Sequence, residues 1–445
     1  MKNKLNLNRH ELLVSPVIRN IFGIGVFRIL GIISNLFLIG LIYRYFSDDE
    51  MNGIWLTISS ILTWITFFDF GMGNSLRNKL TESLSKKDSQ LSNYYISTTY
   101  IIMLVPTLLI IILGLTFAGF IDWEKMFNIT NNKIANNYIS LFISILFILF
   151  SVNFYLSMIY AVLHAMYKSY IIPMIQVLVN IINIILVTIL ILLNINSLIL
   201  LGTIYIGTSI IVLLFTTLWI FKFNKHHLTI NFKYFKWDLV KDIINVGLQF
   251  FVLQISIIVL FNTDNFLISR YIGVEHVTTY HLLNKLLSIN TIILGIVLTP
   301  VWTKVIRDKV KSVGLIKNTL KRLLTLFLLL VIGAIIVGYL SPLIIKIWTG
   351  TSMSIQINLI ILIVLFTVIH MWCNIFQNIL NGLNKLNLQV LCYGLASIIN
   401  IPLSIYLVLN TNLGVSAIIL GTIISLIIPG LILPIYTFNY FKSIS

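Results

Sequence analysis

The stretch Phe67–Lys79 reads FFDFGMGNSLRNK and joins an apolar segment to a basic one. Its acid, Asp69, is one of two acidic residues that fall within the predicted hydrophobic spans of the chain. An ionised side chain at the centre of a membrane span costs about 2.5–3.5 kcal/mol on insertion scales, so such residues commonly serve a function. Glycines follow Asp69 and favour a helix break there. This combination is typical of a membrane transporter and not of a packed core.

The composition excludes a soluble domain. Of the 445 residues, 58% are hydrophobic and 10% are charged, whereas soluble domains carry about 25% charged residues. The apolar runs have the length of membrane-spanning helices, about 20 residues, and they do not alternate as the strands of a β-barrel do. The sequence therefore predicts an all-α polytopic membrane protein.

Hydropathy predicts twelve transmembrane helices. These spans are Ile21–Tyr43, Gly53–Gly71, Tyr94–Phe117, Tyr138–Leu163, Ile171–Leu193, Leu198–Phe221, Val246–Ile268, Val277–Trp302, Leu323–Ile345, Leu359–Leu380, Leu388–Leu409 and Ala417–Tyr436. With the N-terminus in the cytoplasm, 23 of the 30 Lys and Arg residues fall on the inner side and five on the outer side. Because basic residues gather in cytoplasmic loops, this division supports twelve spans and two cytoplasmic termini.

The two halves of the sequence repeat. Three pairs of segments align in the same order: Leu163–Lys168 with Leu380–Lys385, Ile181–Ile184 with Ile398–Ile401, and Leu201–Thr203 with Leu420–Thr422. We therefore expect two pseudo-symmetric six-helix bundles, residues 1–221 and 243–445, joined by a cytoplasmic linker at 222–242. Since six is even, both halves enter the membrane from the same side, an arrangement that suits alternating access to a cavity between them.

Four strongly charged residues lie within the predicted spans: Arg28, Asp69, Asp264 and Lys285. One hypothesis places Arg28 and Lys285 in a cavity that attracts an anionic diphosphate, with Asp69 and Asp264 in coupling or gating. The alternative is one ion pair in each half, Arg28 with Asp69 and Asp264 with Lys285, that holds neighbouring helices together. Both interpretations remain open at the level of sequence.

Other classes of site find no support in the sequence. It has no Walker lysine in a Gly-rich loop and no HExxH motif, so we expect neither an enzyme nor a cofactor. Cys373 and Cys392 lie in apolar stretches and indicate neither a disulfide framework nor a metal site. The net charge of +16 follows from the basic inner loops, so no nucleic-acid partner is expected.

Arg44-Tyr45-Phe46 before an acidic turn, followed by Phe68–Asn78, resembles the bacterial O-antigen and polysaccharide flippases of the multidrug/oligosaccharidyl-lipid/polysaccharide (MOP) exporter superfamily. The resemblance implies a MATE-like fold in the bacterial cytoplasmic (inner) membrane. It also implies translocation of an undecaprenyl-diphosphate-linked oligosaccharide, an O-antigen or capsule repeat unit, through a cationic cavity. Coupling to H⁺ or Na⁺ belongs to the same expectation. Related peptidoglycan-precursor flippases typically have fourteen spans, whereas this chain has room for twelve.

The sequence thus predicts a flippase of lipid-linked oligosaccharides that works by alternating access. Its expected partners are the polyprenyl-diphosphate-linked oligosaccharide, a coupling ion, membrane lipids, and a polysaccharide polymerase or other glycan assembly proteins. Two rivals remain open. One is a multidrug or toxin extruder of the same superfamily, and the other is a non-transporting membrane scaffold of a glycan assembly complex.

Overall fold

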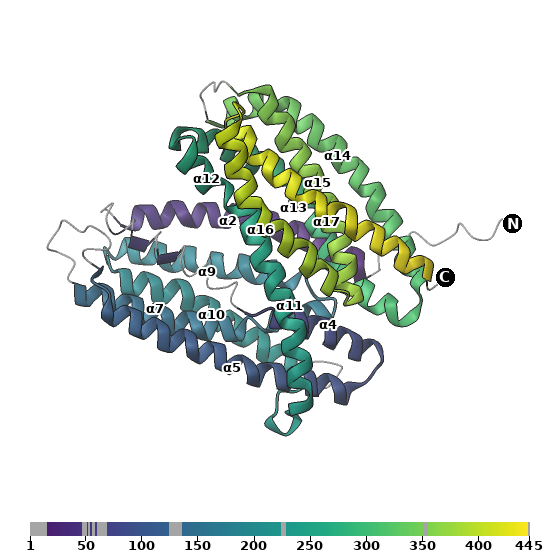
Figure 1. Ribbon diagram of the computed structural model, residues 1–445. Coiled ribbons are helices and arrows are strands. Elements are labelled where there is room, and N and C mark those ends of the chain that lie inside the picture. The colour runs from purple at the N-terminus through teal and green to yellow at the C-terminus, as the bar shows by residue number, and fades with distance from the viewer. Residues whose placement is uncertain are drawn as a thin grey trace. The chain divides into compact units, whose positions relative to one another are not determined.

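The computed structural model describes residues 16–46, 51, 54–55, 58–59, 69–123, 136–223, 228–349 and 355–443. Throughout these ranges the regular structure is helical, with no β-strand (Figure 1). Eleven helical segments among the described residues are long and apolar enough to cross a membrane. The second predicted span, Gly53–Gly71, lies largely outside the described residues. The chain is an all-α polytopic membrane protein, as predicted.

The chain divides into two compact units, residues 1–247 and 248–445, here called the N-terminal and C-terminal units. The N-terminal unit contains α2 (Pro16–Tyr45), α4 (Met72–Ser85), α5 (Ser89–Phe120), α7 (Asn136–Leu156), α8 (Ile159–Ala165), α9 (Ile171–Leu192), α10 (Leu198–Lys222), the 3₁₀ turn η2 (Phe232–Tyr234) and the start of α11 (Trp237–Asn262). The predicted division into bundles 1–221 and 243–445 with a linker at 222–242 stays a prediction.

Helix α7 packs against α5 and α10. Its side chains Phe142, Ile143 and Leu146 are almost fully buried. Helix α9 packs against α2 and α10, and α4 packs against α5 and α8. Large apolar side chains of α2, such as Phe22 and Leu36, are exposed. Such an exposed apolar surface suits helices that contact lipid.

The C-terminal unit contains the rest of α11, α12 (Asp264–Tyr271), α13 (Val274–Lys311), α14 (Val313–Thr349), α15 (Ile357–Leu383), α16 (Asn387–Asn410) and α17 (Val415–Ser443). Helix α15 packs against α13, α14 and α17, and α16 packs against α17. The short helix α12 contacts α13, α16 and α17. It therefore sits among three longer helices of this unit.

Two predicted spans are interrupted in the structure. The fourth span consists of α7 and α8, which are separated by a turn at Ser157 and Met158. The seventh consists of α11 and α12, which are separated at Thr263. Discontinuous membrane helices free backbone polar groups, and transporters use such breaks to bind ions and substrates. The second break comes directly before Asp264.

The aligned segments Leu163–Lys168 and Leu380–Lys385 end in matching turns. Tyr167 and Asn384, which are 217 positions apart, both have a left-handed backbone with φ of 57°. In each turn the amide of the next residue, a lysine, donates a hydrogen bond to the carbonyl five residues earlier. The Lys168 amide donates to the Leu163 carbonyl and the Lys385 amide to the Leu380 carbonyl, both at 2.9 Å. The same helix-ending motif therefore closes α8 and α15.

Candidate functional site

Asp69 caps the start of α4. Its Oδ1 accepts a hydrogen bond from the Gly71 amide at 2.9 Å, and its Oδ2 accepts one from the Gly73 amide at 3.2 Å. Phe70 and Gly71 both have positive φ, 50° and 66°. A Cβ at position 73 would lie 3.0 Å from Oδ2 of Asp69, so a side chain there would crowd the cap. The carboxylate thus stabilises a tight turn and the positive end of a helix dipole.

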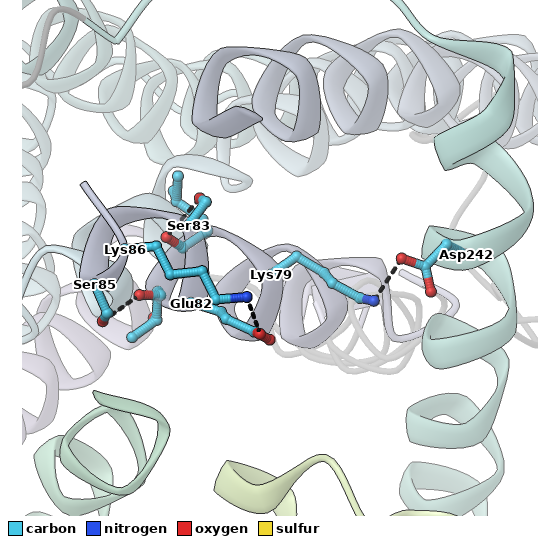
Figure 2. A network of polar contacts seen from close by, with 8 residues as sticks. Lys79, Glu82, Ser83, Ser85, Lys86 and Asp242 are labelled. Carbon is cyan, nitrogen blue, oxygen red and sulfur yellow. Dashed lines mark hydrogen bonds and ion pairs between the residues drawn. The ribbon is translucent and has the colours of Figure 1, made fainter. Parts of the chain in front are cut away.

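One face of α4 is fastened to the start of α11. Ser75 donates its hydroxyl hydrogen to the Ile243 carbonyl at 3.0 Å. One turn further along α4, the Lys79 ammonium lies 2.5 Å from Oδ2 of Asp242 (Figure 2). The Lys79 side chain is 16% exposed and that of Asp242 is 41% exposed. Because water reaches this ion pair, it orients the helices more than it stabilises them.

Gly247 brings α11 against the capped turn. A Cβ added there would lie 2.9 Å from the Phe70 carbonyl oxygen and 3.6 Å from the Met72 amide nitrogen. The first of these distances is too short for a side chain, so only glycine allows this approach. The stretch that contains Asp69 is therefore a docking point for the start of α11.

Arg77 is buried on α4, with 4% of its surface exposed. Burial lowers the pKa of Arg77 to about 9 from its ordinary value of 12.5, while Tyr167 acts in the opposite direction. At neutral pH the guanidinium is still cationic. Since α4 packs against α8 and Tyr167 follows α8, Arg77 belongs to this helix contact. Such a place in the packing gives no support to a role in binding a phosphate.

Asp264 lies at the centre of a polar cluster inside the C-terminal unit and is 2% exposed. Tyr280 of α13 donates to its Oδ2 at 2.9 Å, and Thr422 of α17 donates to its Oδ1 at 3.2 Å. Asn284 donates to the Tyr280 hydroxyl at 3.3 Å, and Asn400 of α16 donates to the Thr422 hydroxyl at 2.9 Å. Helices α12, α13, α16 and α17 therefore supply the cluster.

Two asparagines, the residue that follows Asp264 and a member of the cluster, carry buried amide oxygens. Among the described residues, the Oδ1 atoms of Asn265 and Asn400 are buried without a hydrogen-bond partner. No described cation pairs with Asp264, whose hydrogen-bond partners are both hydroxyl groups. A buried carboxylate that lacks a cation is costly. A proton or a small cation bound at the cluster would remove this cost.

The repeat places no acid at the corresponding position of the N-terminal unit. Arg44-Tyr45 corresponds to Arg270-Tyr271, and the same offset of 226 positions relates Leu38 to Asp264. Leu38 is 1% exposed and belongs to the hydrophobic core. In this alignment the buried carboxylate belongs to the C-terminal half only.

The two predicted cavity cations are exposed. Arg28 lies on α2 and Lys285 on α13. Within the described ranges, neither of the alternative ion pairs, Arg28 with Asp69 or Asp264 with Lys285, is formed. The structure thus brings Asp69 together with glycine amides, and Asp264 together with hydroxyl groups. The role of Arg28 and Lys285 in attracting a diphosphate stays a prediction.

Sequence reasoning did not single out Tyr280 and Thr422 as partners of Asp264. Thr422 and Asn400 do fall within the aligned repeat segments, but this signal pointed to symmetry and not to a site. Tyr280 had no signal, because a tyrosine near the end of a span is typical of an interface anchor. The described residues contain no group of three His, Cys, Asp or Glu residues that could hold a metal ion.

Several solved structures share the fold of this chain. A multidrug resistance MATE family transporter of the MOP superfamily, in an outward-facing conformation, is 14% identical with a TM-score of 0.72, and the match covers 98% of each chain. MATE in the straight conformation is 13% identical with a TM-score of 0.74 and 96% coverage of each chain. A MOP superfamily transporter from Pyrococcus furiosus, whose binding pocket is described as having reversed polarity, is 13% identical with a TM-score of 0.71 and 97% coverage of each.

The sequence itself matches one family model. No curated protein matches the chain. The model of the polysaccharide biosynthesis proteins matches residues 53–306, which is more than half of the chain and includes Asp69 and Asp264. The chain therefore combines a sequence match to a polysaccharide biosynthesis family with a fold that MATE and MOP-superfamily transporters share. The chain belongs to the polysaccharide biosynthesis protein family.

Proposed function

We propose that this protein is a flippase that moves an undecaprenyl-diphosphate-linked oligosaccharide from the inner to the outer leaflet of the bacterial cytoplasmic membrane. The observation that carries the proposal is the match to a polysaccharide biosynthesis family on a chain with an exporter fold. A membrane transporter in such a biosynthesis must move an intermediate that cannot cross lipid unaided. A sugar chain joined to a polyprenyl diphosphate is such an intermediate.

The charged residues of the predicted spans support an ion-coupled mechanism. The Asp264 cluster would bind the coupling ion, H⁺ or Na⁺, because its carboxylate is buried without a described cation. Asp69 would act in gating, through the capped turn on which α11 rests. Arg28 and Lys285, both exposed, would attract the diphosphate. The sugar would cross through a hydrated cleft while the polyprenyl tail remains in lipid.

The same proposal includes the setting of the protein. Both termini would lie in the cytoplasm, where most basic residues are expected. A polysaccharide polymerase and other glycan assembly proteins would use the flipped product. Because polymerisation would remove the flipped oligosaccharide from the outer leaflet, it would also shift the equilibrium of flipping toward that leaflet.

Reconstitution of the purified protein in liposomes tests the proposal. The lipid-linked oligosaccharide is built enzymatically on one leaflet only, and its sugar is then detected on the other leaflet with a labelled lectin. We expect lectin binding to increase with the protein and with an applied H⁺ or Na⁺ gradient. An Asp264→Asn variant serves as the uncoupled control, and empty liposomes give the spontaneous rate. No increase over empty liposomes under either gradient would contradict the proposal.

A multidrug extruder is the second candidate, because several structures with this fold are MATE proteins, one of them named for multidrug resistance. The same liposomes separate the two functions. Gradient-driven uptake of ethidium without movement of the lipid-linked oligosaccharide would favour the extruder. Movement of the oligosaccharide without uptake of ethidium would favour the flippase.

A further inference from the structure

The connector between α10 and α11 contains a segment, Leu228–Lys236, that we call the strap. It is held along α5 by bonds from its backbone to α5 side chains. The Thr229 amide donates to Asn93 Oδ1 at 2.9 Å, the Asn231 amide to Ser97 Oγ at 3.1 Å, and the Lys236 amide to Thr98 Oγ1 at 3.1 Å.

Two further contacts hold the strap in place. Leu228 is fully buried in the core of the N-terminal unit. The rings of Tyr234 and Tyr94 lie 5.8 Å apart. The strap is therefore a fixed part of this unit, and its outer face has a defined composition.

That outer face combines bare aromatic rings with lysines. Phe232 is 78% exposed, and Trp237, the first residue of α11, is 77% exposed. Lys233 and Lys236 are exposed between them. The Lys236 ammonium lies 5.1 Å above the Tyr94 ring, which holds this charge beside the aromatic side chains. Aromatic rings next to basic residues are typical of a surface in the head-group layer of a membrane.

The position of the strap in the chain favours a lipid occupant over a protein partner. The connector that contains the strap joins Lys222, the last residue of α10, to Trp237, and both α10 and α11 belong to candidate membrane spans. Both of its ends must therefore reach the same membrane surface. Lys222 and Lys241 add exposed positive charge near the strap. Two acids follow the strap in sequence: Asp238 is exposed, and Asp242 is paired with Lys79. The balance is positive, which complements an anionic lipid surface.

We infer that the strap and Trp237 lie in the head-group layer of the inner leaflet and bind anionic phospholipid through Lys233 and Lys236. The aromatic rings supply the insertion and the ammonium groups supply the selectivity for negative head groups. Each lysine near an anionic surface contributes about fivefold in binding, or about 1 kcal/mol. The inference does not depend on which substrate the protein moves.

Fluorescence quenching in nanodiscs tests the inference. The full-length protein is placed in mixtures of phosphatidylcholine and phosphatidylglycerol, in which one lipid at a time carries brominated acyl chains. Because the chain has eight tryptophans, the Trp237 emission is taken as the difference between the native protein and a Trp237→Phe variant. We expect quenching by both brominated lipids, with stronger quenching by brominated phosphatidylglycerol at equal mole fraction.

The lysine variants separate insertion from head-group selectivity. In Lys233→Gln/Lys236→Gln, Trp237 should still be quenched, but equally by the two lipids. The matched control is Lys346→Gln, an exposed lysine in the last turn of α14, which should keep the preference for phosphatidylglycerol. If Trp237→Phe fails to fold, a Phe232→Trp variant measured against the native protein reports on the same face. Emission that neither lipid quenches, or equal quenching in the native protein, would overturn the inference.

Discussion

Tyr280 of α13 donates its hydroxyl hydrogen to Oδ2 of Asp264 on α12, at 2.9 Å and out of contact with solvent. The other carboxylate oxygen receives the Thr422 hydroxyl at 3.2 Å. Hydroxyl donors reduce the cost of a buried carboxylate but do not neutralise it. A coupling ion bound at Asp264 would neutralise the carboxylate. The first prediction below tests the charge of Asp264, and the second tests its hydroxyl donor.

Asp264→Asn should separate flipping from its driving force. The amide has nearly the same volume and keeps hydrogen-bonding capacity, so the protein should insert and fold, but it cannot take up a proton or balance a cation. We expect flipping driven by an H⁺ or Na⁺ gradient to be lost, while exchange without a gradient continues. Asp238→Asn, at an exposed acid in the first turn of α11, is the matched control. Unchanged gradient-driven flipping in Asp264→Asn would rule out the coupling role.

Tyr280→Phe should lower stability because of Asp264. Removal of the hydroxyl leaves a buried carboxylate with one fewer donor, which costs about 1–3 kcal/mol. Thermal unfolding in detergent measures the loss. In an Asp264→Asn background the loss should be smaller, since the group left without a donor is then uncharged. Tyr271→Phe, at a tyrosine 41% exposed, is the control and should have little effect. Equal losses in both backgrounds would show that Tyr280 acts independently of Asp264.

The helical fold was predictable because it depends on local properties of the sequence. Span length and loop charge determine which segments enter the membrane. The break at Thr263 was not predictable in this way, because hydropathy is averaged over windows of about 19 residues. One threonine and one aspartate hardly alter such an average. The break becomes evident only in the structure, where α12 contacts α13, α16 and α17.

The candidate site was only partly predictable. Asp264 stood out because an acid within a span is rare. Its partner Thr422 lies 158 positions away and comes close only through packing of α12 against α17. For Asp69, the amides of Gly71 and Gly73 are the nearer local explanation, since aspartates often bond to backbone groups a few residues on. The ion pair of Asp69 with Arg28, one of the two interpretations of the sequence, is not formed among the described residues.

Gly247→Ala should destabilise the contact between α11 and the Asp69 turn. The new Cβ would lie 2.9 Å from the Phe70 carbonyl oxygen, so the backbone must shift, at about 1–3 kcal/mol. The midpoint of thermal unfolding in detergent should fall. Gly295→Ala, in α13, is the matched control because nothing lies within 4 Å of its added Cβ. An alanine there should be neutral or slightly stabilising, since alanine favours helix over glycine. Equal effects at both positions would contradict the close approach.

The ion pair between Lys79 and Asp242 should respond to charge exchange. Lys79→Glu places two carboxylates together and should reduce flipping, whereas Lys79→Glu/Asp242→Lys should restore most of it. The change in stability should stay below about 1 kcal/mol because both groups are partly exposed. The exposed pair of Glu82 in α4 and Lys86, directly after that helix, is 2.8 Å apart and is the control (Figure 2). Its exchange should leave flipping unchanged. Failure of the double exchange to restore activity would show that the charges do not act as a pair.

Arg28→Glu should abolish flipping of the lipid-linked oligosaccharide, because a carboxylate on α2 would repel the diphosphate. Arg28 is exposed and pairs with no described residue, so its replacement should leave folding and membrane insertion intact. Arg28→Lys keeps the charge but not the bidentate geometry, and should retain part of the activity. The rate of lectin-detected flipping is measured for each variant, with the thermal midpoint as a check on folding. If Arg28→Glu flips at the native rate, Arg28 has no part in diphosphate attraction, and Lys285→Glu then becomes the decisive variant.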